Sequence, residues 1–238
     1  MKKLETLLKN YADHVADRAA QGIPPLPLNA EQTNCITQLL EQDSNFDSIY
    51  LLDLLINRVP PGVDEAAYVK ASWLTAIVHG ERHSKYINAE KAIELLGTMV
   101  GGYNVNSLVE ILKGNNNLLA KNAAKVLKKI ILVYDAANDI YDLSKNNVYA
   151  KDIVDSWSNA EWFTCRKPLP KEIKCLAFKI DGETNTDDLS PAVHATSRPD
   201  IPLHALSMLE FKKQDGLKIL DDLKKQDLQI AYVGDVIG

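Results

Sequence analysis

The chain has 238 residues, of which 46% are hydrophobic and 25% are charged, a composition that can bury the core of one large or two ordinary domains. Its formal net charge of −5 disfavours a general affinity for nucleic acid but leaves room for a local basic patch. No apolar run of about 18 residues predicts a transmembrane helix, and charged residues soon after Lys2 and Lys3 interrupt the apolar core that a signal peptide needs.

The three cysteines, Cys35, Cys165 and Cys175, are odd in number and far apart in the sequence. This pattern argues against a disulfide framework and fits a reducing compartment, so we expect a cytoplasmic protein. No C-x-x-C motif is present, and we therefore expect no metal site made from this chain alone.

The first two thirds of the chain predict helices joined by short connectors. Asn29, Asp64 and Asn88 are the expected N-caps of three of them, and Gly22 is expected to end the first. We expect such helices to pair antiparallel and stack, although the sequence has no clean repeat period. Apolar residues at helical spacing predict helices over about 3–20, 30–42, 48–59, 65–80, 89–99, 105–113, 117–134, 135–144 and 147–163.

The pattern changes at residues 166–172, where "RKPLPKE" contains two prolines and predicts a linker. The later elements are predicted as a strand over 173–180, helices over 201–213 and 216–226, and a buried strand over 230–233 that enters a turn at Gly234. This order opens an α/β domain. Because such a domain needs further strands, we expect that the sequence is a fragment or that its second domain is unfinished. The predicted domains are 1–165 and 173–238.

The stretch "GETNTDDLSPA" at 182–192 follows the first predicted strand. It is rich in turn-forming residues, so we expect a loop without helix or core strand, whose side chains satisfy its own backbone groups. A functional alternative is that Asp187, Asp188 and Ser190 line a polar pocket, since adjacent acids can bind a metal ion or accept hydrogen bonds.

Arg198 precedes a proline in "TSRPD", and the position before proline favours an extended backbone with a projecting side chain. Its guanidinium matches a carboxylate bidentately. Two interpretations remain open on these residues alone: a surface arginine paired with Asp200, or a residue that binds the carboxylate of a ligand.

Four lysines, Lys121, Lys125, Lys128 and Lys129, recur at helical spacing and are expected to share one helix face. That face can meet phosphates. The simpler alternative is a solvated face opposite an apolar one.

Several motifs, in the same order, resemble the N-terminal region of the bacterial aconitase B family, and the resemblance covers essentially the whole chain. They include "NRVPPGVDEAAYVKA", "KAIELLGTM", "GGYN", "SRPDIPLHAL" and "AYVGDV". The resemblance implies a multidomain protein of α and α/β classes. A HEAT-like α-helical domain would occupy 1–165, and 173–238 would form the first part of an aconitase swivel domain.

The resemblance also implies that the parent protein is a hydro-lyase that interconverts citrate and isocitrate through cis-aconitate, with dehydration of 2-methylisocitrate as a further activity. A [4Fe–4S] cluster acts as the Lewis acid in such enzymes. The cluster's ligands and the catalytic serine are expected outside this chain, which is predicted to be inactive alone. By match to "SRPD", Arg198 is expected to bind a substrate carboxylate, and the 182–192 loop to shape the pocket wall.

A competing hypothesis makes the helical domain the functional unit. The resemblance implies a homodimer through this domain and binding of messenger RNA when iron is scarce, with no membrane association. The four lysines named above are then the candidate contact face for RNA or a protein partner.

Overall fold

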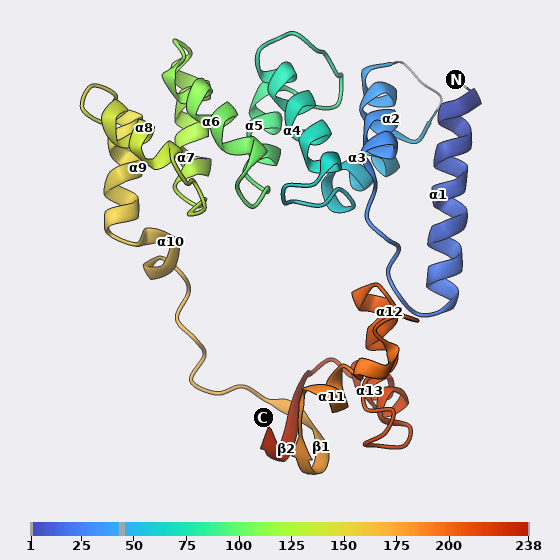
Figure 1. The fold of residues 1–238 in the computed structure, drawn as a ribbon. Helices are drawn as coiled ribbons and strands as arrows, with labels where there is room; N and C mark the ends of the chain where they lie inside the picture. Colours follow the sequence, from blue (N-terminus) through green and yellow to red (C-terminus); the bar gives the residue numbers. More distant parts are fainter. Residues whose placement is uncertain (1, 43–45, 238) are drawn as a thin grey trace. The chain divides into compact units, whose positions relative to one another are not determined.

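The computed structural model describes residues 2–42 and 46–237 (Figure 1). It divides into two compact units. The helical unit comprises residues 1–15 and 25–167, and the α/β unit comprises residues 16–24 and 168–238. None of the described helices is long and apolar enough to span a lipid bilayer.

The helical unit consists of paired helices stacked in two rows (Figure 1). In one row α2, α4, α6 and α8 contact one another in turn, and α5, α7 and α9 do so in the other. Sequence neighbours α4–α5, α6–α7 and α8–α9 join the rows. The helices are α1 (Lys2–Ala20), α2 (Ala30–Glu41), α3 (Ser48–Asn57), α4 (Glu65–Val78), α5 (Ala89–Leu96), α6 (Tyr103–Lys113), α7 (Asn117–Leu127), α8 (Ala136–Leu143), α9 (Val148–Ser158) and α10 (Glu161–Thr164).

The predicted helix starts are confirmed, with side-chain caps at each. Asn29 forms a capping box with Gln32, the Asp64 carboxylate accepts a hydrogen bond from the N–H of Ala67, and the Asn88 side chain accepts one from the N–H of Lys91. These bonds satisfy backbone donors that have no partner inside the helix.

Several predicted helices end two or three residues early, and two differ more from the prediction. The helix predicted over 117–134 ends as α7 at Leu127, and Tyr134 has a left-handed φ of 49°. The one predicted over 147–163 is divided into α9 and α10 at Ala160, whose φ is 50°. A non-glycine residue in this region interrupts helical hydrogen bonding. Ile130 and Val133 in the segment after α7 are buried in the core. Their burial stabilises the turn relative to a longer helix.

One apolar core runs through the helical unit from Tyr11 to Ile153. Its members include completely buried side chains such as Ile36, Leu74 and Leu108. Burying a side chain of this size stabilises the fold by about 1.5–3 kcal/mol. Helices of both rows contribute side chains to this core. The stability of each helix pair therefore depends on packing against the neighbouring pairs.

The α/β unit contains a two-stranded parallel sheet. Strand β1 (Cys175–Thr184) pairs with β2 (Gln229–Ile237), with Cys175 opposite Gln229 and Ile180 opposite Gly234. The chain between them forms α11 (Thr186–Leu189), the 3₁₀ helix η1 (Ala192–His194), α12 (Ile201–Ala205) and α13 (Gly216–Lys224). A helical region followed by the beginning of an α/β region confirms the predicted order of fold classes.

Three details of the α/β prediction are wrong. The polar stretch 182–192 is not free of regular structure, because β1 extends to Thr184 and α11 follows it. Asn185 makes this helical turn possible through a capping box with Asp188. Helix α12 ends at Ala205 instead of continuing to 213. Strand β2 passes through Gly234 without turning, since pairing with β1 holds it extended, and its residues 230–233 are not buried as predicted.

Candidate functional site

A pocket of about 360 Å³ in the α/β unit brings together parts of the predicted site. Ser190 and Arg198 both line it, whereas Asp187 and Asp188 are not among its lining residues. The remaining wall comes from α12 and the loop before it. The pocket is lined by Leu189, Ser190, Ala195, Arg198, Pro199, Asp200, Ile201, His204 and Ala205.

Arg198 is half-buried in this pocket, and its backbone N–H donates to the carbonyl oxygen of His194 over 2.9 Å. Among the side chains that the structure describes, none forms an ion pair with its guanidinium. The alternative partner considered from the sequence, Asp200, is instead bound by Arg18, with Nη1–Oδ2 and Nη2–Oδ1 distances of 2.9 and 2.7 Å. The Arg198 cation therefore faces a pocket with its hydrogen-bonding capacity available to an anion.

Ser190 and His204 form a polar contact on the pocket wall. The Oγ of Ser190 lies 3.1 Å from Nε2 of His204. The N–H of Ser190, the residue that follows α11, donates to the carbonyl oxygen of Thr186, and the His204 N–H donates to that of Asp200. The backbone of each residue is thus fixed by a short helical segment.

The two loop acids lie differently from one another. The carboxylate of Asp188 accepts the N–H of Asn185 over 3.1 Å, and its carbonyl oxygen accepts the N–H of Leu209 over 2.7 Å. Asp187 is exposed on the same turn. Asp188 therefore stabilises the turn that carries Ser190, and a direct role for either acid in binding stays a prediction.

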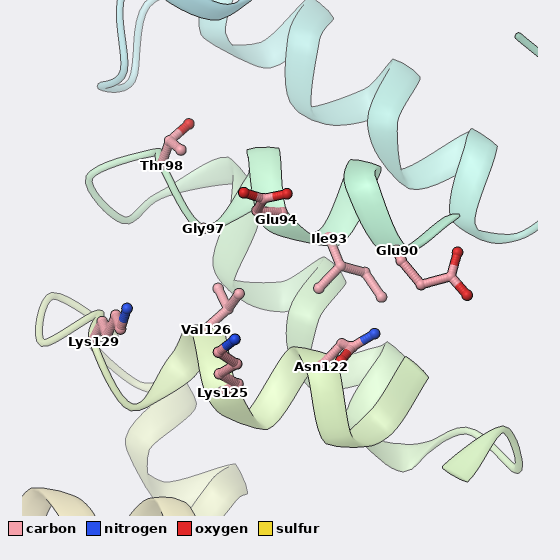
Figure 2. Close-up of a pocket in the computed structure, with 9 residues that line it drawn as sticks. All are labelled: Glu90, Ile93, Glu94, Gly97, Thr98, Asn122, Lys125, Val126 and Lys129. Carbon is pink, nitrogen blue, oxygen red and sulfur yellow. The ribbon is translucent and has the colours of Figure 1, made fainter. Parts of the chain in front are cut away.

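The four predicted lysines lie on α7 and the turn after it, beside two pockets of about 410 and 550 Å³ in the helical unit. Lys125 and Lys129 line both pockets, and Lys121 lines neither. Lys128 lines the larger one, and its Nζ pairs with the carboxylate of Asp152 over 2.6 Å. In Figure 2, Lys125 projects from α7 beneath α5, the helix that carries Glu94.

The cysteines do not gather into a metal site. Cys35 is buried, and burial raises the pKa of its thiol, whereas Cys165 and Cys175 are exposed. Within residues 2–42 and 46–237, no group of three or more His, Cys, Asp or Glu side chains is placed to hold a metal ion.

Two residues in or near this pocket, His204 and Arg18, were not predicted as site residues from the sequence. His204 lies within the "SRPDIPLHAL" motif, four residues after Asp200, and helical spacing from the N-cap was a usable signal for it. Arg18 offered no such signal, because 182 residues separate it from Asp200.

Two family models match most of the chain. Residues 10–163 match the model described as the aconitate B N-terminal domain. Residues 175–238 match the model described as the aconitate hydratase 2 N-terminus. The boundary between the two matches lies in the segment where the chain passes from helices to β1.

Curated relatives named aconitate hydratase B align along nearly all of the chain. The protein from Synechocystis sp. is 53% identical over 232 residues, which cover 98% of this chain and 27% of the relative. The Escherichia coli protein is 49% identical, with 98% and 28% covered, and the Helicobacter pylori protein is 44% identical, with 99% and 28% covered. The chain thus spans less than a third of these relatives, and the matches together show that it belongs to the aconitate hydratase B family.

Proposed function

We propose that the chain is the N-terminal part of an aconitate hydratase, a hydro-lyase that interconverts citrate and isocitrate through cis-aconitate in the cytoplasm. Family membership and the name shared by the relatives support this assignment. Dehydration of 2-methylisocitrate is included as a second reaction of the same site. In this proposal residues 1–165 form a HEAT-like domain, 166–172 a linker, and 173–238 the first part of a swivel domain.

The observation that carries the proposal is the placement of Arg198. Its guanidinium lines the pocket that Ser190 and His204 also line, and no described carboxylate pairs with it. A tricarboxylate supplies the matching anion, and each charge-assisted hydrogen bond to it contributes about 1.5–3 kcal/mol. We assign Arg198 to a substrate carboxylate and Ser190 to the pocket wall. Asp187 and Asp188 would shape that wall through the turn they form.

The [4Fe–4S] cluster proposed for the parent enzyme would supply the Lewis acid that polarises the substrate hydroxyl. The described residues do not fit such a cluster, since they bring no three potential ligands together. We therefore place its ligands outside this chain, and from the family resemblance we propose the same for the catalytic base. The role left to the chain is to bind and orient the substrate.

The test is Arg198→Gln in the full-length enzyme. Loss of a charged contact of this size raises the KM for citrate by about 10- to 150-fold, and Arg198→Lys retains part of the affinity because it keeps the charge but not the fork. Arg82→Gln, which removes an arginine paired with Glu41 in the helical unit, is the matched control. A KM unchanged in Arg198→Gln would remove this residue from the substrate site.

We propose a second function for the helical region, as a module that binds messenger RNA or a protein partner and forms the homodimer contact. Lys125 and Lys129 are exposed, line two adjoining pockets, and pair with no described carboxylate. Lys121 is exposed nearby, while the ion pair to Asp152 leaves Lys128 less available.

The double substitution Lys125→Glu/Lys129→Glu tests this function. Binding of the full-length protein to RNA is measured at two salt concentrations, and we expect the variant to bind more weakly with a smaller dependence on salt, since fewer counterions are released. Lys145→Glu/Lys151→Glu, at two exposed lysines that pair with Asp142 and Asp155, makes the same change in net charge and is the control. Equal losses in both proteins would exclude a specific role for the α7 lysines.

A further inference from the structure

A buried arginine holds the segment that carries Arg198. Only 7% of the Arg18 surface is exposed, and each of its three guanidinium nitrogens donates a hydrogen bond. Nε donates to the carbonyl oxygen of Pro24 over 2.9 Å, while Nη1 and Nη2 bind the two carboxylate oxygens of Asp200. All three residues belong to the α/β unit, which includes residues 16–24.

Arg18 lies in the last turn of α1, where backbone hydrogen bonds cap the helix. Its carbonyl oxygen accepts the N–H of Ile23 over 3.1 Å, and the Gly22 N–H donates to the carbonyl oxygen of Ala19 over 2.9 Å. Gly22 has a φ of 72°, the left-handed conformation that ends a helix in this way. The hydrogen bond and the charge of Asp200 raise the pKa of Arg18, so the guanidinium stays charged.

Asp200 links Arg18 to the pocket, because it binds Arg18 and also lines the pocket. Its Oδ1 also accepts the N–H of Leu203 as the N-cap of α12, and its carbonyl oxygen accepts the N–H of His204. Asp200 follows Arg198 by two residues, with Pro199 between them, and the proline ring fixes the intervening φ. Since the Arg198 N–H is bound to His194, the short segment is held on both sides.

The contact between Arg18 and Asp200 also affects which anion can bind the Arg198 guanidinium. Asp200 is the nearest carboxylate in sequence to Arg198 on the pocket wall. The Arg18 fork binds both oxygens of that carboxylate. If Arg18 were absent, Asp200 would be an anion within the same pocket and would compete with a ligand carboxylate for the Arg198 guanidinium.

We propose that Arg18 is a positioning residue of the substrate pocket, which binds Asp200 so that the Arg198 segment keeps its place and the Arg198 guanidinium remains open to substrate. This inference rests on the proposed role of Arg198. It assigns a function in substrate binding to the end of α1, a helix whose residues 2–15 belong to the helical unit.

The experiment is steady-state kinetics of the full-length enzyme with Arg18→Gln, Asp200→Asn and the double variant. For Arg18→Gln we expect the KM for citrate to rise about tenfold while kcat stays within about twofold, because ground-state binding is what weakens. Asn retains the N-cap of α12 and removes the competing charge. The double variant lacks the competing charge but also lacks the anchor, so its KM should lie between those of Arg18→Gln and the original enzyme, a coupling that independent sites do not show.

A purely structural role gives a different result. In that case Arg18→Gln lowers thermal stability and the active fraction, but leaves the KM of the folded enzyme unchanged, and the proposal is overturned. A double variant that keeps the raised KM also overturns it. If Arg18→Gln does not fold, Arg18→Lys, which keeps the charge without the fork, should raise the KM by a smaller factor.

Two further variants separate the possible failures. Lys9→Gln removes an exposed α1 ion pair with Asp13 and should leave the KM unchanged. Arg198→Gln is measured in parallel. An effect of Arg198→Gln without one of Arg18→Gln contradicts the positioning role alone, whereas no effect of Arg198→Gln contradicts the proposed function, and the positioning role falls with it.

Discussion

Lys70 shows how one residue can make the stability of the fold depend on pH. It is 2% exposed within the helical core, and its Nζ donates a 3.4 Å hydrogen bond to the carbonyl oxygen of Ile56, in the last turn of α3. A helix C-terminus favours a cation. Burial nevertheless lowers the pKa of Lys70 to about 8, because the interior penalises the charged form.

The sign of the pH dependence follows from this lowered pKa. Below pH 8 the lysine is protonated in both states, and the folded state carries the full cost of burying the charge. Between pH 8 and the ordinary value of 10.5 only the unfolded state is protonated, so the free energy of unfolding rises with pH, by about 3 kcal/mol in total.

Urea denaturation between pH 7 and pH 10 tests this expectation, with Lys70→Met as the variant. Methionine does not titrate, so the rise that Lys70 contributes should be missing from the variant. Lys151→Met, at an exposed lysine paired with Asp155, corrects for the general effect of losing a charge. If the free energy of unfolding changed with pH in the same way for the original chain and Lys70→Met, burial would not lower the pKa of Lys70.

At the scale of elements, close packing joins α5 to α7. Gly97 ends α5 with a φ of −70°, and a Cβ atom placed there would lie 2.6 Å from Cγ1 of Val126 on α7. Its φ suits alanine, so the main obstacle to a side chain is Val126, with the carbonyl oxygen of Glu94 at 3.1 Å as a lesser one. Figure 2 shows Glu94 of α5 above Lys125 of α7.

Gly97→Ala should therefore lower the free energy of unfolding by about 1–3 kcal/mol, the range for overpacking a well-filled interface. Val126→Ala in the same chain removes both clashing methyl groups and should make the added alanine nearly neutral, which a double-mutant cycle measures. Gly62→Ala is the matched control, because a Cβ at Gly62 meets nothing within 4 Å. An equal loss in Gly62→Ala would show that the contact with Val126 is not the cause.

At the scale of the whole molecule, the two units differ in how they are stabilised. The helical unit has a continuous apolar core drawn from most of its helices. The described core of the α/β unit centres on Phe178, Ile180 and Leu209. Its two strands leave Val233 and Val236 largely exposed, and sheets usually need three or more strands for independent stability. Most of the hydrophobic stabilisation therefore comes from the helical unit.

The sequence by itself determined features that depend on neighbouring residues. Helix starts at Asn29, Asp64 and Asn88 were predictable because a capping side chain bonds to backbone groups two or three positions away. The order of helices and strands followed from periodicity, which is also local. The motifs that indicated the family are likewise continuous stretches of chain.

Only the tertiary structure decided where these local preferences end and which distant groups meet. The break at Ala160, the end of α7 at Leu127 and the extended Gly234 all depend on packing or strand pairing that no local pattern encodes. The pocket that Arg198 lines likewise includes Asp200, whose carboxylate is bound by Arg18. Their contact joins two side chains 182 residues apart, and such a pairing exists only once the chain has folded around it.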